Sequence, residues 1–285
     1  MSIEFNLIPK KVFFVKDIIE KIKKLHPDIV VEKRDKNYYF VYIDEQSFKG
    51  IDLTFSRPLL KKWNIEVRNT VLSHPLEYEL TNQIIELIAG ATKAEILDDG
   101  DEKMSLPVYD TSQSEERFVS DARLTFQLVQ LNDSPVTIFG VRRKVHFGKR
   151  VYKQFEPYFD DDEALSAKMK EFLYRTQYGI PNFDYGLVWN TFRPDDEKQE
   201  HPVVMKLLTN QENILIDKYD YILIDRETGN PIMITNDILN EILPETWTLI
   251  DEYTVVAPKL TAKQWENFLE EAAKYDIFEQ TMKNL

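Results

Sequence analysis

Apolar residues recur every three or four positions in several segments of the chain, which is the spacing of one face of an amphipathic helix. The first such segment, residues 15–25, has lysines between its apolar positions and predicts a helix. His26-Pro27 is expected to end it, because the residue before a proline avoids the α region. The same spacing predicts further helices over residues 74–90, 162–178, 203–208, 236–243 and 262–272.

Other segments alternate apolar and polar residues or are rich in β-branched residues, which is typical of strands. Residues 38–44 and 50–56 are expected to pair through a polar turn. From Ala122 the period is two, so we expect a strand that turns at residues 132–135 and forms a hairpin with residues 136–147. Further strands are expected over residues 62–73, 94–99, 184–192, 219–225, 230–235 and 246–256.

Local signals indicate where several helices begin and end. Pro75 suits the first turn of a helix, where its missing N–H costs nothing, and Gly90 is expected to cap the same helix. Gly179 is expected to end a later one. Thr261 and Gln264 have the spacing of a capping box at the start of the last helix.

Helices and mainly antiparallel strand pairs alternate along the chain, so we expect an α+β protein. The order helix, hairpin, strand, helix occurs in both the first and the last third. We therefore expect an N-terminal α+β unit over residues 1–104, a middle segment with a hairpin, a helix and many aromatic residues over 105–200, and a C-terminal α+β unit over 201–285.

The two end units also share residues. With an offset of 181, Ile43-Asp44 aligns with Ile224-Asp225, and after a three-residue insertion Trp63 aligns with Trp247. We predict an internal duplication of α-β-β-β-α units. The alternative is that similar secondary structure produces similar patterning without common descent.

The overall charge limits the classes of partner. The 285 residues include 36 Lys and Arg against 49 Asp and Glu, a net charge of −13. Nucleic-acid binding depends on basic side chains, so we do not expect a nucleic-acid partner. No stretch is apolar enough for a secretory signal or a membrane span. We expect a cytoplasmic protein with a full core and no membrane partner, since 43 % of its residues are hydrophobic.

The motifs of several enzyme classes are missing from the sequence. There is no cysteine, which excludes disulfides, thiol nucleophiles and cysteine-ligated metals. The 8 glycines form neither a phosphate-binding loop nor a nucleophile elbow. Asp160, Asp162 and Glu171 match three calcium-loop positions, but Leu165 stands where that loop requires glycine. We expect no metal and no other cofactor.

A basic run on or beside a predicted strand departs from the acidic composition. It could bind a phosphate, an acidic peptide or a polyanion, or it could pair with the protein's own carboxylates. His146 is expected to lie exposed on the strand. Residues 152–192, which follow, are rich in aromatic residues, as is typical of an interaction surface or of a core. The candidate binding residues are Arg142, Arg143, Lys144, His146, Lys149 and Arg150.

Two segments resemble a known group of proteins. Residues 48–55, FKGIDLTF, and residues 63–100, which begin WNIEVRNTVLSHP, are similar to uncharacterised cytoplasmic proteins of low-GC Gram-positive bacteria that are grouped as a domain of unknown function. The resemblance implies a bacterial, cytoplasmic protein. It implies no reaction, no cofactor and no catalytic residue.

Three functional hypotheses follow from the sequence. Its acidity, its lack of catalytic motifs and its basic and aromatic middle segment favour a non-enzymatic interaction or regulatory protein, of the accessory or immunity type, whose partner is another protein. The alternative is a metal-independent hydrolase or transferase with carboxylates and arginines in a cleft between the two units. The third hypothesis is an acidic mimic of nucleic acid.

Overall fold

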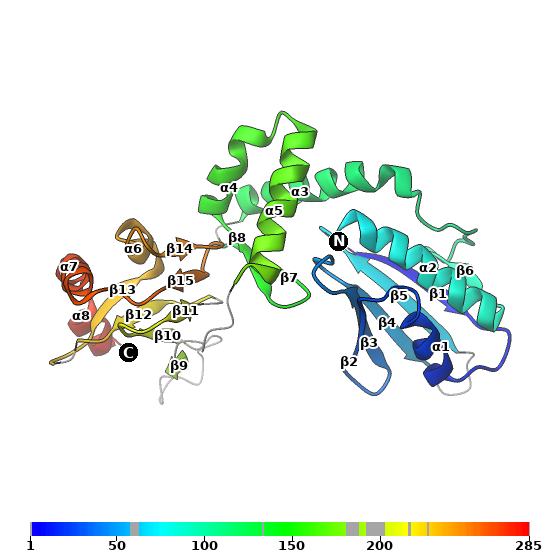
Figure 1. Ribbon diagram of the computed structural model, residues 1–285, viewed down its shortest axis with the longest axis horizontal. Coiled ribbons are helices and arrows are strands. Elements are labelled where there is room, and N and C mark those ends of the chain that lie inside the picture. The colour runs from blue at the N-terminus through cyan, green and yellow to red at the C-terminus, as the bar shows by residue number, and fades with distance from the viewer. Residues whose placement is uncertain are drawn as a thin grey trace. The chain divides into compact units, whose positions relative to one another are not determined.

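The computed structural model describes residues 2–57, 63–132, 134–180, 188–191, 203–215, 218–226 and 228–284. Helices and mostly antiparallel sheets make up this part of the chain, which confirms the expected α+β class. The chain divides into two compact units, residues 1–179 and residues 180–285 (Figure 1).

The first unit is built on a six-stranded antiparallel sheet with the strand order β2-β3-β4-β5-β1-β6 (Figure 1). In β4, Ile51, Leu53 and Phe55 are fully buried and alternate with half-buried polar residues. Helices α1 (Val15–Ile22) and α2 (Pro75–Thr92) pack on the face that carries these apolar side chains. The strands are β1 (Ser2–Ile8), β2 (Ile29–Lys33), β3 (Tyr38–Ile43), β4 (Ile51–Ser56), β5 (Asn64–Thr70) and β6 (Glu95–Leu97).

The opposite face of this sheet is largely polar. The strand register aligns Glu4, Arg68, Asp52, Phe40 and Glu32 in one row across five neighbouring strands. Side chains opposite one another on the same face of a sheet are close enough to interact. Arg68 donates from Nε and Nη2 to Oδ2 of Asp52, at 3.2 and 2.8 Å. This face therefore carries an ion pair beside a small apolar cluster, in which Phe40 and Tyr42 pack against Val141.

The rest of the first unit is mainly helical and has its own apolar core. The Phe126 ring lies 5.0 Å from that of Phe155 and 5.9 Å from that of Phe147, measured between ring centroids. Phe155 and Phe172 are buried here, so part of the predicted aromatic segment is core. The elements are α3 (Ser114–Leu131), β7 (Val136–Phe139), β8 (Lys144–Phe147), α4 (Lys149–Phe155) and α5 (Asp162–Tyr178), with 3₁₀ turns at Thr111–Gln113 and Glu156–Tyr158.

The second unit contains two small sheets and three helices in its described part. One sheet has the order β13-β12-β10-β9, in which β10 and β12 are parallel, and the other has the order β11-β15-β14. The core residue Trp265, on α7, packs against Phe268 with ring centroids 5.5 Å apart. The elements are β9 (Val188–Thr191), β10 (Val203–Leu208), β11 (Asn213–Leu215), β12 (Tyr221–Ile224), β13 (Ile232–Thr235), α6 (Asn236–Glu241), β14 (Thr248–Leu249), β15 (Val255–Ala257), α7 (Ala262–Ala273) and α8 (Phe278–Asn284).

The strand expected from Ala122 is wrong, because this segment belongs to helix α3. The buried residues of α3 include Phe118, Ala122, Phe126 and Val129, which follow helical spacing. A short window in which apolar and polar residues alternate can match both the strand period and the helical period. Packing of α3 against α5 favours the helix. The hairpin is formed within residues 136–147 alone, where β7 pairs with β8.

Three other expectations are also corrected. Residues 203–208 form strand β10, not a helix, because β-branched Val203 and Val204 pair with β9. The long strand expected over 246–256 is two short strands, since the Asp251 carboxylate accepts backbone N–H groups two and three residues later and holds a turn. Helix α2 continues past Gly90, and Lys93 ends it with a φ of 54°. The expected strand over 184–192 lies within the described residues only at 188–191, where it is a strand.

The boundary between the two units and the strand pairing within them differ in part from the domain organisation expected from the sequence. The expected boundary at residue 104 falls inside the first unit, and the expected middle segment is shared between both units. A hairpin occurs in each end unit, β3-β4 and β12-β13. In the first unit the next strand, β5, pairs with β4, whereas in the second unit β15 pairs with β14 and β11. The duplication stays a prediction.

Candidate functional site

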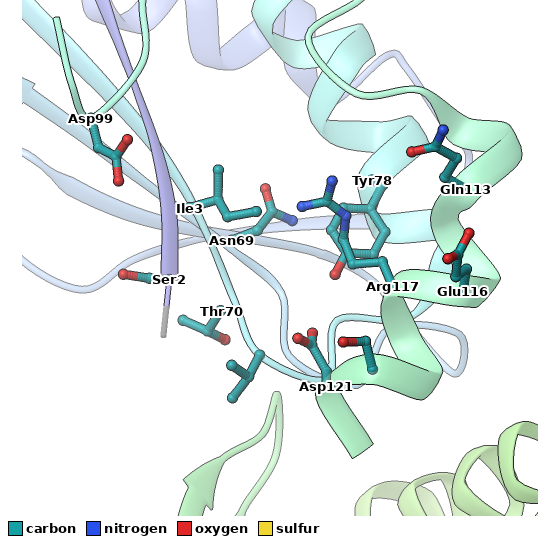
Figure 2. A pocket seen from close by; sticks show the side chains of 12 residues that line it. Ser2, Ile3, Asn69, Thr70, Tyr78, Asp99, Gln113, Glu116, Arg117 and Asp121 are labelled. Atoms are coloured by element: carbon teal, nitrogen blue, oxygen red, sulfur yellow. The ribbon is translucent and has the colours of Figure 1, made fainter. Parts of the chain in front are cut away.

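A cavity of about 650 Å³ lies in the first unit between helix α3 and one end of the six-stranded sheet (Figure 2). Strands β1 and β5, helix α2 and the turn after β6 provide the rest of its wall. It is large enough for a small metabolite, since ligand sites range from about 300 to 1,000 Å³. The lining residues are Ser2, Ile3, Asn69, Thr70, Val71, Tyr78, Asp99, Gln113, Glu116, Arg117, Ser120 and Asp121.

Helix α3 contributes a polar stripe to this wall. Ser120 lies four residues after Glu116, and Asp121 four residues after Arg117, so one side of the helix carries both pairs. Just before the helix, the Asp110 carboxylate accepts the backbone N–H of a residue in the preceding turn at 3.0 Å. This bond caps the 3₁₀ turn that leads directly into the helix.

Asn69 is the most deeply buried polar group in the cavity wall, with 1 % of its surface exposed. Its side chain follows Ile65 and Val67 at the inward positions of β5, where an apolar residue is expected. Its Oδ1 accepts from the Thr81 hydroxyl at 2.8 Å. Its Nδ2 has no hydrogen-bond partner within the described residues. A buried amide donor left without a partner costs about 1–3 kcal/mol. Less than 1 Å² of this nitrogen is exposed, so a ligand acceptor reaches it when the side chains around it move.

Arg117 is held beside Asn69 by two tyrosine rings. Its guanidinium carbon lies 5.6 Å from the ring centroid of Tyr78 and 5.3 Å from that of Tyr109. Burial raises the pKa of both tyrosines, so the rings remain neutral and favour the cation by cation–π attraction. Figure 2 shows Asn69, Tyr78 and Arg117 directed into the same space. Two groups that only donate there, an amide N–H and a guanidinium, call for an acceptor such as a carboxylate.

Acidic side chains provide the complementary charge. Oδ2 of Asp121 accepts the backbone N–H of Leu72 at 2.9 Å. Burial raises the pKa of Asp121, and that hydrogen bond and the nearby Arg117 partly oppose the effect. Together with Asp99 and Glu116, Asp121 gives the cavity wall three carboxylates beside one guanidinium. A ligand with an ammonium group as well as a carboxylate would complement both charges.

The structure places the predicted basic run on the β7-β8 hairpin and the start of α4, away from the residues that line this cavity. Arg142, in the hairpin turn, donates from Nη2 to Oδ1 of Asp44 at 2.8 Å and lies 4.9 Å from the Tyr178 ring. The Asp44 hydrogen bond raises the pKa of Arg142. This contact matches the alternative that the run pairs with the protein's own carboxylates.

The other residues of the run have separate environments. The backbone N–H groups of Arg142 and Arg143 both donate to Oε1 of Gln177, at 3.0 and 3.3 Å. Lys144 is exposed and lies 5.7 Å from the Phe139 ring. Lys149 is exposed and Arg150 half-buried at the start of α4.

The expected exposure of His146 is wrong. It lies on a strand, as predicted, but only 3 % of it is exposed, and its Nδ1 lies 2.9 Å from the Thr137 hydroxyl on the partner strand. Val145 and Phe147 on either side of it belong to the helical core, so strand alternation places His146 on the opposite face of the hairpin. The charges beside it in the sequence do not reveal that it is buried there.

The cavity residues were not identified from the sequence. One signal was available for Asn69, because it interrupts the apolar alternation of β5. Arg117 and Asp121 carry no such signal, since polar residues are ordinary on a helix. Only the packing of α3 against the sheet end brings them together.

Two further observations concern the part of the chain that the structure describes. It contains no group of three or more His, Asp or Glu side chains placed to hold a metal ion. None of its helices is both long enough and apolar enough to cross a bilayer. Comparisons of the chain with protein-family models, with curated proteins and with solved structures find no match.

Proposed function

We propose that this chain is a non-enzymatic regulatory protein whose first unit binds a small zwitterion of the amino-acid type in the cavity beside α3. The ligand carboxylate accepts from Arg117 and from the Asn69 amide, and its ammonium faces Asp121. The observation that carries the proposal is the buried Asn69 donor, which has no partner among the described residues and lies beside a guanidinium held by two tyrosines.

The expected protein partner and the expected cytoplasmic location form part of this proposal. The β7-β8 hairpin presents exposed Lys144 and an exposed Phe139, which is 68 % exposed, and α4 presents Lys149. A cation beside an exposed aromatic ring is typical of a protein-binding surface. We propose that ligand occupancy at α3 alters how this surface contacts an acidic protein.

The enzyme alternative has one observation in its favour. Burial raises the pKa of Asp121, and a carboxyl with a raised pKa can act as a general acid. The described cavity wall, however, contains no histidine and no lysine to serve as the matching base or nucleophile. Binding of a ligand without its chemical conversion is therefore more consistent with the residues of this site.

The test is calorimetric titration of the full chain with glycine, the smallest probe that has both charged groups. We expect glycine to bind more tightly than acetate or ethylammonium, which each provide one group. Arg117→Gln and Asn69→Asp should each weaken glycine binding about 10-fold or more. Arg123→Gln is the matched control, since Arg123 lies on the same helix and bonds to the Phe159 carbonyl oxygen, outside the cavity.

Two outcomes would contradict the proposal. One is equal binding of glycine, acetate and ethylammonium. The other is a wild-type affinity in both Arg117→Gln and Asn69→Asp when their circular dichroism shows that they are folded. Consumption of a bound amino acid during the titration would instead support the enzyme alternative.

A further inference from the structure

A second cavity of about 480 Å³ lies between the polar face of the sheet and the segment formed by α3 and β7. Its wall combines cations with apolar side chains. The cations are Arg34, Lys49 and Arg68, and Asp52 is the acidic residue in the described wall. Basic side chains therefore outnumber acidic ones in this wall, whereas acidic side chains are in excess over the whole chain. The wall is suited to binding an anion.

Of the three cationic side chains, that of Lys49 has the fewest interactions with other described residues. Only 6 % of it is exposed, and its Nζ donates to the backbone carbonyl oxygen of Phe139. An ammonium has three donors, and within the described residues this is the one hydrogen bond that Nζ makes. No carboxylate of the described residues lies within ion-pair distance of it. Burial lowers the pKa of Lys49 to about 8, although Glu77 and Asp52 oppose the effect.

The other charged groups of the wall already have partners. Asp52 accepts from Arg68 at 2.8 Å and from the Tyr38 hydroxyl at 2.5 Å. Arg34 lies 3.6 Å from the centroid of the Phe40 ring and donates to Glu32 at 3.4 Å. Arg34 and Arg68 thus each have a carboxylate partner, whereas Lys49 has none among the described residues and is the cation of this wall whose charge an incoming anion would balance.

The remaining wall is apolar and partly exposed. Phe139 is 68 % exposed and Leu128 is 39 % exposed, and Leu124 and Val136 complete this side. An apolar ligand group that lay along these side chains would remove their surface from water, which is favourable. A hydrocarbon body suits these contacts, whereas a free inorganic anion would leave them in water.

We propose that this cavity binds an organic monocarboxylate, with its carboxylate on the Lys49 ammonium and its hydrocarbon body along Leu128 and Phe139. The site is distinct from the Asn69 and Arg117 cavity, although Thr70 and Val71 line both. Its ligand needs one charge and an apolar chain, not two charges.

The test is calorimetric titration of the full chain with octanoate, with 1-octanol as the uncharged comparison. We expect octanoate to bind more tightly than 1-octanol, and Lys49→Met to weaken octanoate binding about 10-fold or more. Because the ammonium form binds the carboxylate, affinity should fall as pH rises through about 8, the pKa of Lys49. This pH dependence should be absent in Lys49→Met. Arg117→Gln should leave octanoate binding unchanged, which separates this site from the glycine site.

A measurement on the unsubstituted protein covers the case in which Lys49→Met does not fold. Reductive methylation of each lysine can be followed by peptide mass spectrometry with and without octanoate. We expect octanoate to slow the methylation of Lys49 and not that of exposed Lys23. Equal methylation of Lys49 in both samples, or equal affinity for octanoate and 1-octanol, would overturn the proposal.

Discussion

The Glu77 carboxylate accepts the backbone N–H of Lys49 at 3.1 Å, although the two residues are 28 positions apart. Glu77 also accepts the N–H of Gly50, and that of His74 at 2.5 Å. One buried carboxylate near the start of α2 thus joins that helix to the segment that leads into β4. These hydrogen bonds hold in place the backbone from which the Lys49 side chain extends into its cavity.

Replacement of Glu77 by glutamine should destabilise the first unit by about 1–3 kcal/mol, because an amide cannot accept all three N–H groups and leaves buried donors unsatisfied. Urea unfolding monitored by circular dichroism measures the change. Glu79→Gln, two positions along the same helix at an exposed site, should change stability little. Equal stability of the two variants would contradict this role for Glu77.

His74 should make the first unit sensitive to acid. It caps α2 through its Nδ1, which accepts the N–H of Leu76 at 3.2 Å, so the imidazole must be neutral. Burial, and secondly the nearby Lys170, lower its pKa from 6.5 to about 4. Between these values the unfolded chain binds the proton more readily, so stability falls as pH falls.

The loss at His74 should reach about 3 kcal/mol, since one pKa unit corresponds to about 1.4 kcal/mol. Thermal unfolding across this pH range, compared between the wild type and His74→Asn, measures it. Asparagine can cap a helix and does not titrate. The wild type should lose more stability on acidification than His74→Asn, and parallel pH profiles would contradict the assignment.

Gly50 and Gly90 should respond to alanine in opposite directions. Gly50 has a φ of +69°, and an added Cβ would lie 2.4 Å from Cζ of Phe40, so Gly50→Ala should destabilise the unit by more than about 1 kcal/mol. Gly90 lies within α2 with no atom within 4 Å of an added Cβ. Gly90→Ala should stabilise by about 0.5–1 kcal/mol. The two melting temperatures check this, and the same shift in both would be inconsistent with it.

Arg142 should contribute little to stability despite its ion pair. Its side chain is 41 % exposed and that of its partner Asp44 is 40 % exposed. Exposed pairs are worth about 0–1 kcal/mol, so Arg142→Ala should change the free energy of unfolding by less than about 1 kcal/mol. Urea unfolding at low and high salt tests this, and a larger loss that salt does not reduce would show a structural role.

The sequence predicted elements whose signals are local. The Thr261 and Gln264 capping box occurs at the start of α7 as expected, with both of its hydrogen bonds. The segments from Ala122 and from Val203 were assigned to the wrong class because several apolar residues in a short window fit either period. Long-range packing decided them, and no local pattern carries that information.

The cavity depended even more on tertiary structure. Asn69, Tyr78 and Arg117 come from a strand and two helices, and their spacing in the sequence follows no motif. The basic run was conspicuous in the sequence, but His146 is buried in the fold and the hairpin turn directs Arg142 to Asp44. Charge density along a chain does not indicate which side chains the fold will bring together.

The Asn69 amide provides the most direct test of zwitterion binding beside α3. The full chain with isotope-labelled asparagine can be titrated with glycine while the side-chain amide resonances are recorded by nuclear magnetic resonance, Asn69 being assigned by its loss in Asn69→Asp. The account predicts a saturable shift of the Asn69 amide protons as they gain an acceptor, and no such shift in Arg117→Gln. Asn69 resonances that stay unchanged while glycine binds would contradict it.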